Sequence, residues 1–535
     1  MFVTGLLLIA SASAPNLPIT ALPRAKYAEN LCHYRYAVGT ANADCQRYCD
    51  QAFGYYYSYV WMEAARSFET ALQYDPDCAS AWLGLSKALD KWGKSTTPKP
   101  DAMLALVGIG MQAKLPARYA QTPKDFALNQ AKELMPKANH RERLLITAKL
   151  YERGMMPNTP PDDRRKKAQQ TLDELITIYE DDEEGWFARA QLADGTNGGT
   201  PFYKALLRIN PIHPGASHEL VHFYENIQRP ALGWPHAEKY MQSSPGIAHA
   251  FHMQAHLGMR IGKWQHTSDY SMRGIGLQRA YHTLLDVKAG DDHQFFHHLE
   301  TLTRSLVHDG RFPEARQIRT ESMGHSYNFR PEWFRLAVTA KDWPLAEEQV
   351  AAMRKANKLD AAYYGALLGF ETGNLDRAKA ELDTLRQAWQ AKRGDRKQEA
   401  RLQELQGRLA CRNGDGENGV KLLKRIIDKT KNDYNHHAWG GGAYYMEVWG
   451  DGALECGLFA EAEEAYQEAL AHDSGSVRGA LGLWALCDRL GRTDEASHYL
   501  KLAQRCWARA EVQLFESLKA GYAAKVRSME TASGG

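Results

Sequence analysis

A repeat period of 34 residues is the feature of this sequence that most restricts its fold. Four residues near the C-terminal end recur 34 positions later: Gly457, Ala462, Tyr466 and Ala469 correspond to Gly491, Ala496, Leu500 and Ala503. Small residues at fixed positions allow paired helices to approach closely, and each pair buries its apolar stripe against its neighbours. No segment with a strand-like period competes with this pattern. The sequence therefore predicts an all-α solenoid of roughly a dozen helix pairs.

The N-terminal part carries a second version of the unit. Ala64, Phe68, Ala71 and Pro76 follow the spacing A-x3-F-x2-A-x4-P, and Trp82 follows Pro76 by six residues. This pattern resembles the second half of a tetratricopeptide repeat (TPR) and the start of the next one. We therefore expect a TPR-like α-α solenoid, a superhelix of helix pairs.

Composition narrows the class of protein further. The chain has 535 residues, of which 44% are hydrophobic and 24% charged, and its formal net charge is +2. These values are typical of a folded, soluble chain, and the balanced charge favours neither a nucleic-acid partner nor an anionic membrane. We expect no membrane span. The expected organisation is a signal peptide at 1–14, a linker at 15–40, TPR units at 41–160, TPR-like units with a histidine cluster at 161–330, TPR units at 331–520, and a tail at 521–535.

The first fourteen residues, MFVTGLLLIASASA, form a short apolar stretch that ends in Ala10-Ser11-Ala12. This A-x-A signal predicts cleavage and export to the periplasm or cell envelope, whereas the protein is cytoplasmic if the segment is not a signal. The stretch is too short to cross a bilayer as a helix. In an exported protein, Cys32, Cys45 and Cys49 lie close enough in sequence for a bridge to form among them.

Histidines are concentrated in the middle of the chain, where 14 of the 20 fall between His213 and His325. His218, His222 and Glu225 follow i, i+4, i+7 spacing, which places them on one helical face. A second face is predicted for His249, His252 and His256, with spacing i, i+3, i+7.

The two histidine segments also share the repeat register, because His218 and His252, like His222 and His256, are 34 residues apart. Equivalent positions of adjacent repeats lie side by side, so we expect both sets to face one groove and bind a divalent transition metal. Six candidate ligands are more than the four of a tetrahedral zinc site. Either some of them only hydrogen-bond to the metal ligands, or the site is octahedral or dinuclear. The pattern does not distinguish zinc, copper and iron. His293 and His297 either complete the site or extend its polar lining.

Two further residues are candidates for catalysis. His218-Glu219-x-x-His222 matches the H-E-x-x-H pattern of zinc peptidases, in which the glutamate acts on metal-bound water. We predict Glu219 as a base, Glu225 as the better metal ligand, and Arg260 as a group that holds an anionic part of a substrate. The alternative is that Glu219 pairs with a basic neighbour and that Arg260 caps or braces its helix.

The central motif resembles a family of bacterial TPR proteins, many of them exported and largely without assigned function. The resemblance covers most of residues 40–510. It rests on H-x-x-x-H-x-x-E at 218–225, on Pro245-Gly246, on H-x-x-H-x-x-x-H at 249–256, and on Arg260 and Gly262. Family members have an aromatic residue in place of Glu219, which argues against a peptidase, and Pro-Ser in place of Gln254-Ala255.

These observations support three interpretations of function. The first is a TPR solenoid that binds a transition-metal ion in a histidine-rich groove, either as a hydrolase or oxidoreductase or without catalysis. The alternative is a non-enzymatic TPR scaffold for protein–protein interaction, and the third is an H-E-x-x-H zinc peptidase. The expected partners are a small-molecule or peptide ligand in the groove and another protein.

Overall fold

The computed structural model describes residues 16–93, 122–195, 197–391, 394–430 and 443–527, and the predicted signal peptide at 1–14 lies outside them. Within these ranges there are 25 α-helices, one short 3-10 helix and no strands, and 74% of the residues are helical. The predicted all-α solenoid is therefore confirmed. None of the helices described is long and apolar enough to cross a membrane.

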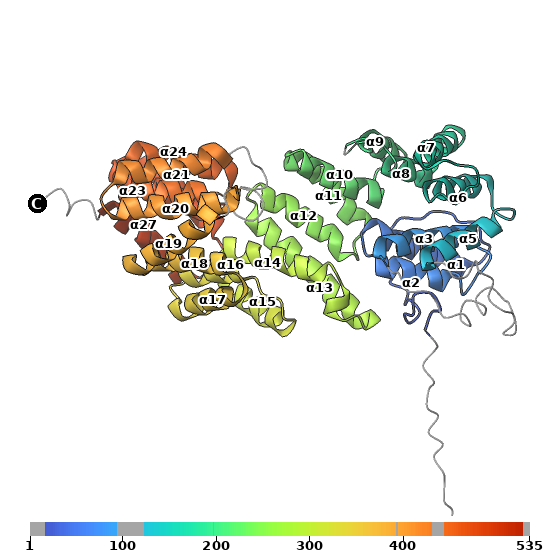
Figure 1. Ribbon diagram of the computed structural model, residues 1–535, viewed down its shortest axis with the longest axis horizontal. Helices are drawn as coiled ribbons and strands as arrows, with labels where there is room; N and C mark the ends of the chain where they lie inside the picture. The colour runs from blue at the N-terminus through green and yellow to red at the C-terminus, as the bar shows by residue number, and fades with distance from the viewer. Residues whose placement is uncertain (1–15, 94–121, 196, 392–393, 431–442, 528–535) are drawn as a thin grey trace, which may run out of the picture. The chain divides into compact units, whose positions relative to one another are not determined.

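The chain forms two compact units, which we treat separately. Unit 1 contains the described residues up to Ala250 together with Arg279–Asp286. Consecutive helices pack against one another along this unit (Figure 1). Its helices are α1 (Ala43–Tyr57), α2 (Trp61–Ala71), α3 (Ala79–Trp92), α5 (Pro123–Leu134), α6 (His140–Glu152), α7 (Pro161–Ile178), α8 (Glu183–Gln191), α9 (Thr200–Ile209), α10 (Pro214–Asn226) and α11 (Pro230–Ser243).

Unit 2 contains Phe251–Gln278 and the described residues from Val287 onward. Two helices, α12 (Ala248–Arg260) and α13 (Trp264–Leu285), have most of their residues in unit 2 and one end in unit 1. The others are η2 (Ala289–Asp291), α14 (Phe295–His308), α15 (Phe312–Gly324), α16 (Arg330–Thr339), α17 (Trp343–Ala356), α18 (Lys358–Glu371), α19 (Leu375–Ala391), α20 (Arg396–Arg412), α21 (Gly416–Thr430), α23 (Tyr444–Glu455), α24 (Phe459–His472), α25 (Val477–Arg489), α26 (Thr493–Cys506) and α27 (Val512–Arg527).

Close approach of helices explains the small residues of the repeat. Phe68 of α2 is buried against Gly84 of α3, where an added Cβ would lie 2.4 Å from the ring. Tyr466 of α24 lies in the same way against Gly482 of α25, where an added Cβ would lie 2.3 Å from the ring. The aromatic position of one helix thus requires a glycine on the next helix in both units.

The segment before α1, expected as a linker, is packed into unit 1. Ile19 and Tyr34 are each only 2% exposed. The His33 N–H donates to the carbonyl of Ser243 at 2.7 Å, and the Gly246 N–H donates to the carbonyl of Leu31 at 3.1 Å. The start of the described chain therefore covers the connection between α11 and α12.

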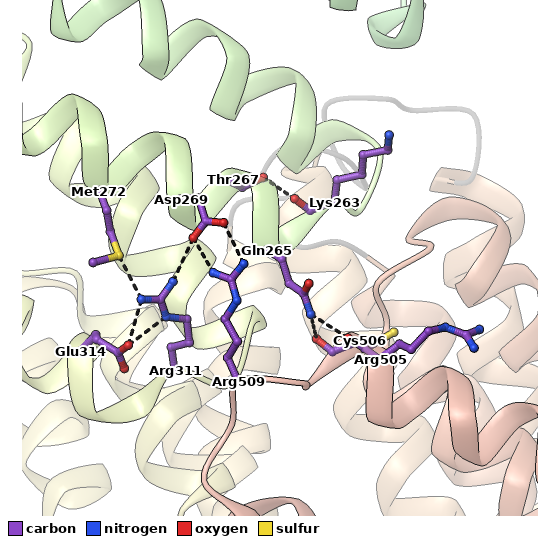
Figure 2. Close-up of polar contacts among 10 residues, drawn as sticks. All are labelled: Lys263, Gln265, Thr267, Asp269, Met272, Arg311, Glu314, Arg505, Cys506 and Arg509. Carbon is purple, nitrogen blue, oxygen red and sulfur yellow. Dashed lines mark hydrogen bonds and ion pairs between the residues drawn. The ribbon is translucent and has the colours of Figure 1, made fainter.

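The C-terminal repeats of unit 2 return to its first helices. The Trp264 indole N–H donates to the Asp473 carboxylate at 2.9 Å, and the Trp507 indole N–H donates to the His308 carbonyl at 2.8 Å. Figure 2 shows Asp269 of α13 between the guanidinium groups of Arg311 and Arg509. Within unit 2, the solenoid therefore closes on itself.

We expect Asp269→Asn to lower the free energy of unfolding of unit 2 by less than about 1 kcal/mol at neutral pH, because the Asp269 side chain is 52% exposed. The hydrogen bond from Arg509 lowers the pKa of Asp269. A carboxyl group whose pKa is lower in the folded state stabilises the fold above its unfolded pKa, and this contribution disappears as the pH falls through the folded pKa. Urea unfolding of both proteins should show the difference at pH 7 and lose it in acid; a difference that persists in acid would refute this role.

Candidate metal centres and binding cavity

Three histidines of unit 1 converge on one point, and we call them triad 1: His218, His222 and His249. His218 and His222 come from α10, and His249 comes from the start of α12. The Nε2 atom of His218 lies 3.0 Å from Nε2 of His222 and 3.0 Å from Nε2 of His249. Nitrogens bound tetrahedrally at about 2.0–2.1 Å from one ion lie about 3.3 Å apart, so the two distances from His218 are close to those of a metal site.

The backbone fixes the orientation of His218. Its Nδ1 atom lies 2.8 Å from the carbonyl oxygen of Tyr57, so Nδ1 carries the hydrogen and donates it. Nε2 is then left with its lone pair toward the other two histidines. Burial, followed by the neighbouring His222, lowers the pKa of His218 well below its usual value, which keeps the ring neutral. A neutral imidazole is the form that binds a metal.

Helix α10, which presents two of these rings, has a histidine as its N-cap. The His213 Nδ1 atom accepts the N–H of Ala216 at 3.1 Å, and Pro214 occupies the first helical turn. Burial lowers the pKa of His213 to about 3, so this ring is neutral and its nitrogen is available to accept the bond.

Tyr59 covers triad 1. Its ring centroid lies 4.4 Å from that of His218, and its plane is nearly parallel to that of His222 at 6.0 Å. Its backbone has φ +60°, a left-handed conformation that costs free energy in a residue other than glycine. The Tyr59 hydroxyl donates to the Glu219 carboxylate at 2.9 Å. Glu219, the predicted base, is therefore linked to triad 1 by a hydrogen bond from Tyr59, whose ring packs on His218. Tyr59 was not predicted, because it lies far from the histidines in the chain and belongs to no motif.

Two predicted residues lie beside the histidines. The Glu225 carboxylate is 3.7 Å from Nδ1 of His222, on the side of the ring opposite the nitrogen that faces the triad. Glu225 thus lies next to the outer nitrogen of His222, at a distance longer than a hydrogen bond, and its role as a metal ligand stays a prediction. Arg260 is 6% exposed and is the last residue of α12, where a cation interacts favourably with the helix dipole. This position agrees with the helix-bracing alternative; binding of an anion by Arg260 stays a prediction.

A second group, triad 2, lies in unit 2 and consists of His252, His256 and His297. Nε2 of His256 and Nε2 of His297 are 3.1 Å apart, and the ring centroids of His252 and His256 are 4.3 Å apart. His297 thus joins the group, whereas His293 is exposed and is not part of it. Glu300 lies 3.6 Å from Nδ1 of His297.

His298 supports triad 2 and was not predicted. Its ring stacks on His252 at 3.9 Å, and its Nδ1 atom lies 2.7 Å from the side-chain oxygen of Gln278. The Gln278 amide in turn donates to Asp292. Burial lowers the pKa of His298 to about 3. Its position next to His297 was the only signal in the sequence.

The grouping differs from the single six-residue site expected from the 34-residue register. His218 meets His249, which is 31 residues away, and does not share a triad with His252. His249 precedes His252, the equivalent repeat position, by three residues, which is nearly one helical turn. The side chain that faces His218 therefore comes from the preceding turn of α12. The structure thus shows two groups of three, one in each unit.

Unit 2 also contains a cavity of about 610 Å³, which we call the arginine–tyrosine cavity. Its lining comes chiefly from α14, α16, α18, α20, α23 and α25, the first helix of successive pairs. Four tyrosines line it: Tyr363, Tyr364, Tyr444 and Tyr445. Seven basic residues line it, against five acidic ones: Arg304, Arg330, Arg335, Lys397, Arg401, Arg408 and Arg478.

Comparison with known proteins agrees with the repeat architecture. Residues 56–93, which contain α2 and α3, match the sequence model of the tetratricopeptide repeat. A search of curated protein sequences finds no match.

Three solved structures of low sequence identity are among those similar to this chain. The APC/C hetero-tetramer Cut9–Hcn1 is 12% identical over 90% of each chain, with a TM-score of 0.32. Yeast Tom70 is 11% identical over 91% of this chain and 90% of that one, with a TM-score of 0.23. The TPR domain of P58(IPK) is 11% identical over 73% of this chain and 99% of that one, with a TM-score of 0.18. The chain is an all-α solenoid that contains a tetratricopeptide repeat at residues 56–93.

Proposed function

We propose that this protein is an interaction scaffold that binds an acidic segment of a partner protein in the arginine–tyrosine cavity. The observation that carries the proposal is the composition of the inner helices of unit 2, which present tyrosine and arginine side chains to one cavity. These residue types contribute most to binding at protein interfaces, because each gives a large contact area together with a polar group.

The charge of the cavity favours an acidic occupant. Arg401 lies 4.4 Å above the Tyr363 ring and forms an ion pair with Asp360 at 2.6 Å. Desolvation, followed by the neighbouring Arg401, lowers the pKa of Lys397. A carboxylate placed beside Lys397 would reduce the repulsion between the two cations and gain a charge-assisted hydrogen bond.

The test compares a fluorescent glutamate-rich peptide with a lysine-rich peptide of the same length. We expect only the acidic peptide to bind, and we expect Lys397→Gln combined with Tyr364→Ala to weaken its binding at least about tenfold, or about 1.4 kcal/mol. Lys355→Gln is the control, since Lys355 is exposed on α17 and does not line the cavity. Equal binding of both peptides, or an unchanged affinity in the double variant, would exclude the proposal.

We also propose that triad 1 and triad 2 each hold one divalent transition-metal ion: zinc, copper or iron. Support comes from the Nε2 atoms of triad 1, which converge while Nδ1 of His218 is occupied by a carbonyl. Three histidines plus a water molecule form a ligand set used by catalytic zinc, and a hydrolase or oxidoreductase would use that fourth position. Catalysis with Glu219 as base and Arg260 as anion-binding group remains a prediction.

Export of the protein is still proposed, whereas zinc peptidase activity is not. Export through the segment at 1–14 remains a proposal, and it would place the scaffold in the periplasm or cell envelope. A zinc peptidase is not proposed, because H-E-x-x-H makes such an enzyme in a zincin fold, whereas α10 is a helix of a solenoid.

A further inference from the structure

Three cysteines in the core of unit 1 form a group distinct from the histidine triads, which we call the thiol trio: Cys45, Cys49 and Cys78. Cys45 and Cys49 are one helical turn apart on α1, and Cys78 is the N-cap of α3. The three Sγ atoms lie within 4.8 Å of one another, and each residue is 0% exposed. Cys32, which could bridge to Cys45 or Cys49 in an exported protein, is a free thiol here, and its sulfur lies 3.4 Å from the Ser244 hydroxyl oxygen.

The trio brings three sulfur donors together inside the core of unit 1. Because Cys45, Cys49 and Cys78 are all fully buried, an ion bound by them would be shielded from solvent. The thiolate is the form of cysteine that binds a metal.

Three sulfur donors favour a soft cation. Sulfurs bound at about 2.3 Å around one ion in a plane lie about 4 Å apart, within the separation observed. Thiolates select Cu(I) and zinc among common metals, but zinc in structural sites takes four ligands. Among the described residues, the group contains three donors.

We propose that Cys45, Cys49 and Cys78 bind one Cu(I) ion through three sulfurs and thereby join α1 to α3. Binding releases the thiol protons, so that all three sulfurs coordinate as thiolates. An ion that binds the folded chain more tightly than the unfolded one adds its binding free energy to the stability of unit 1.

The test uses the full chain with His222→Ala and His256→Ala, so that each triad lacks a ligand. Anaerobic titration with Cu(I) against a chromophoric chelator should give one tightly bound ion, near-ultraviolet thiolate-to-copper absorption, and a higher melting temperature. Adding Cys78→Ser should weaken this binding at least about 100-fold. The matched control is Cys487→Ser, which removes another fully buried thiol, on α25.

Two measurements decide the proposal even if the Cys78 variant folds poorly. The first is X-ray absorption of the His222→Ala, His256→Ala chain, with the trio intact and one equivalent of Cu(I) bound. It should show three sulfur neighbours around copper, whereas nitrogen or oxygen neighbours would refute the site. Thiol titration of the freshly purified, unreduced and denatured chain should count all 8 cysteines once copper is removed. A count of six, with a disulfide mapped within the trio, would show an oxidised link in place of a metal site.

Discussion

The His222→Ala variant should bind Zn²⁺ in unit 1 at least about 100-fold more weakly than the unmutated protein. His222 supplies one of three converging nitrogens, and loss of even an outer partner of a metal ligand commonly costs ten- to a hundredfold in affinity. Its side chain is 32% exposed, so removing it should leave helicity unchanged. Competition with a chromophoric zinc chelator and far-ultraviolet circular dichroism would measure the two quantities.

A matched control lies on the next helix. His236 of α11 is also half-buried but belongs to neither triad, so His236→Ala should retain full affinity. The double variant His222→Ala, His256→Ala should lose zinc from both units. If the double variant keeps the zinc content of the unmutated chain, the histidines are a polar lining and the metal proposal fails.

Replacement of Phe68 by Ala should lower the free energy of unfolding of unit 1 by about 3–5 kcal/mol. Phe68 is 1% exposed and fills the space above Gly84, which has no side chain with which to close the cavity left behind. Urea unfolding followed by circular dichroism would measure the shift.

The control for Phe68 is Phe296→Ala in unit 2. Phe296 is 42% exposed, so its removal should cost far less than that of Phe68. Similar losses for the two variants would mean that Phe68 is not the packing centre of its repeat.

The repeat itself was predictable because it is a local property. Ala64, Phe68 and Ala71 fall on one face of α2, and their spacing alone specifies a helix that packs closely on the next one. The sequence family model matches this same stretch, residues 56–93. By contrast, the packing of the segment expected as a linker depends on Ser243 and Gly246, which lie more than 200 residues further along the chain.

Some residues of the candidate sites were also predictable from the sequence, and others were not. The sequence by itself determined that His218 and His222 share a face of α10, and that His252 and His256 share a face of α12, because helical periodicity is set within a few residues. Only the tertiary structure decided their third partners, His249 and His297, and brought Cys78 to Cys45 and Cys49. Those choices depend on how far one helix is displaced along its neighbour. A displacement of a single turn exchanges one facing residue for another, and the repeat period does not specify it.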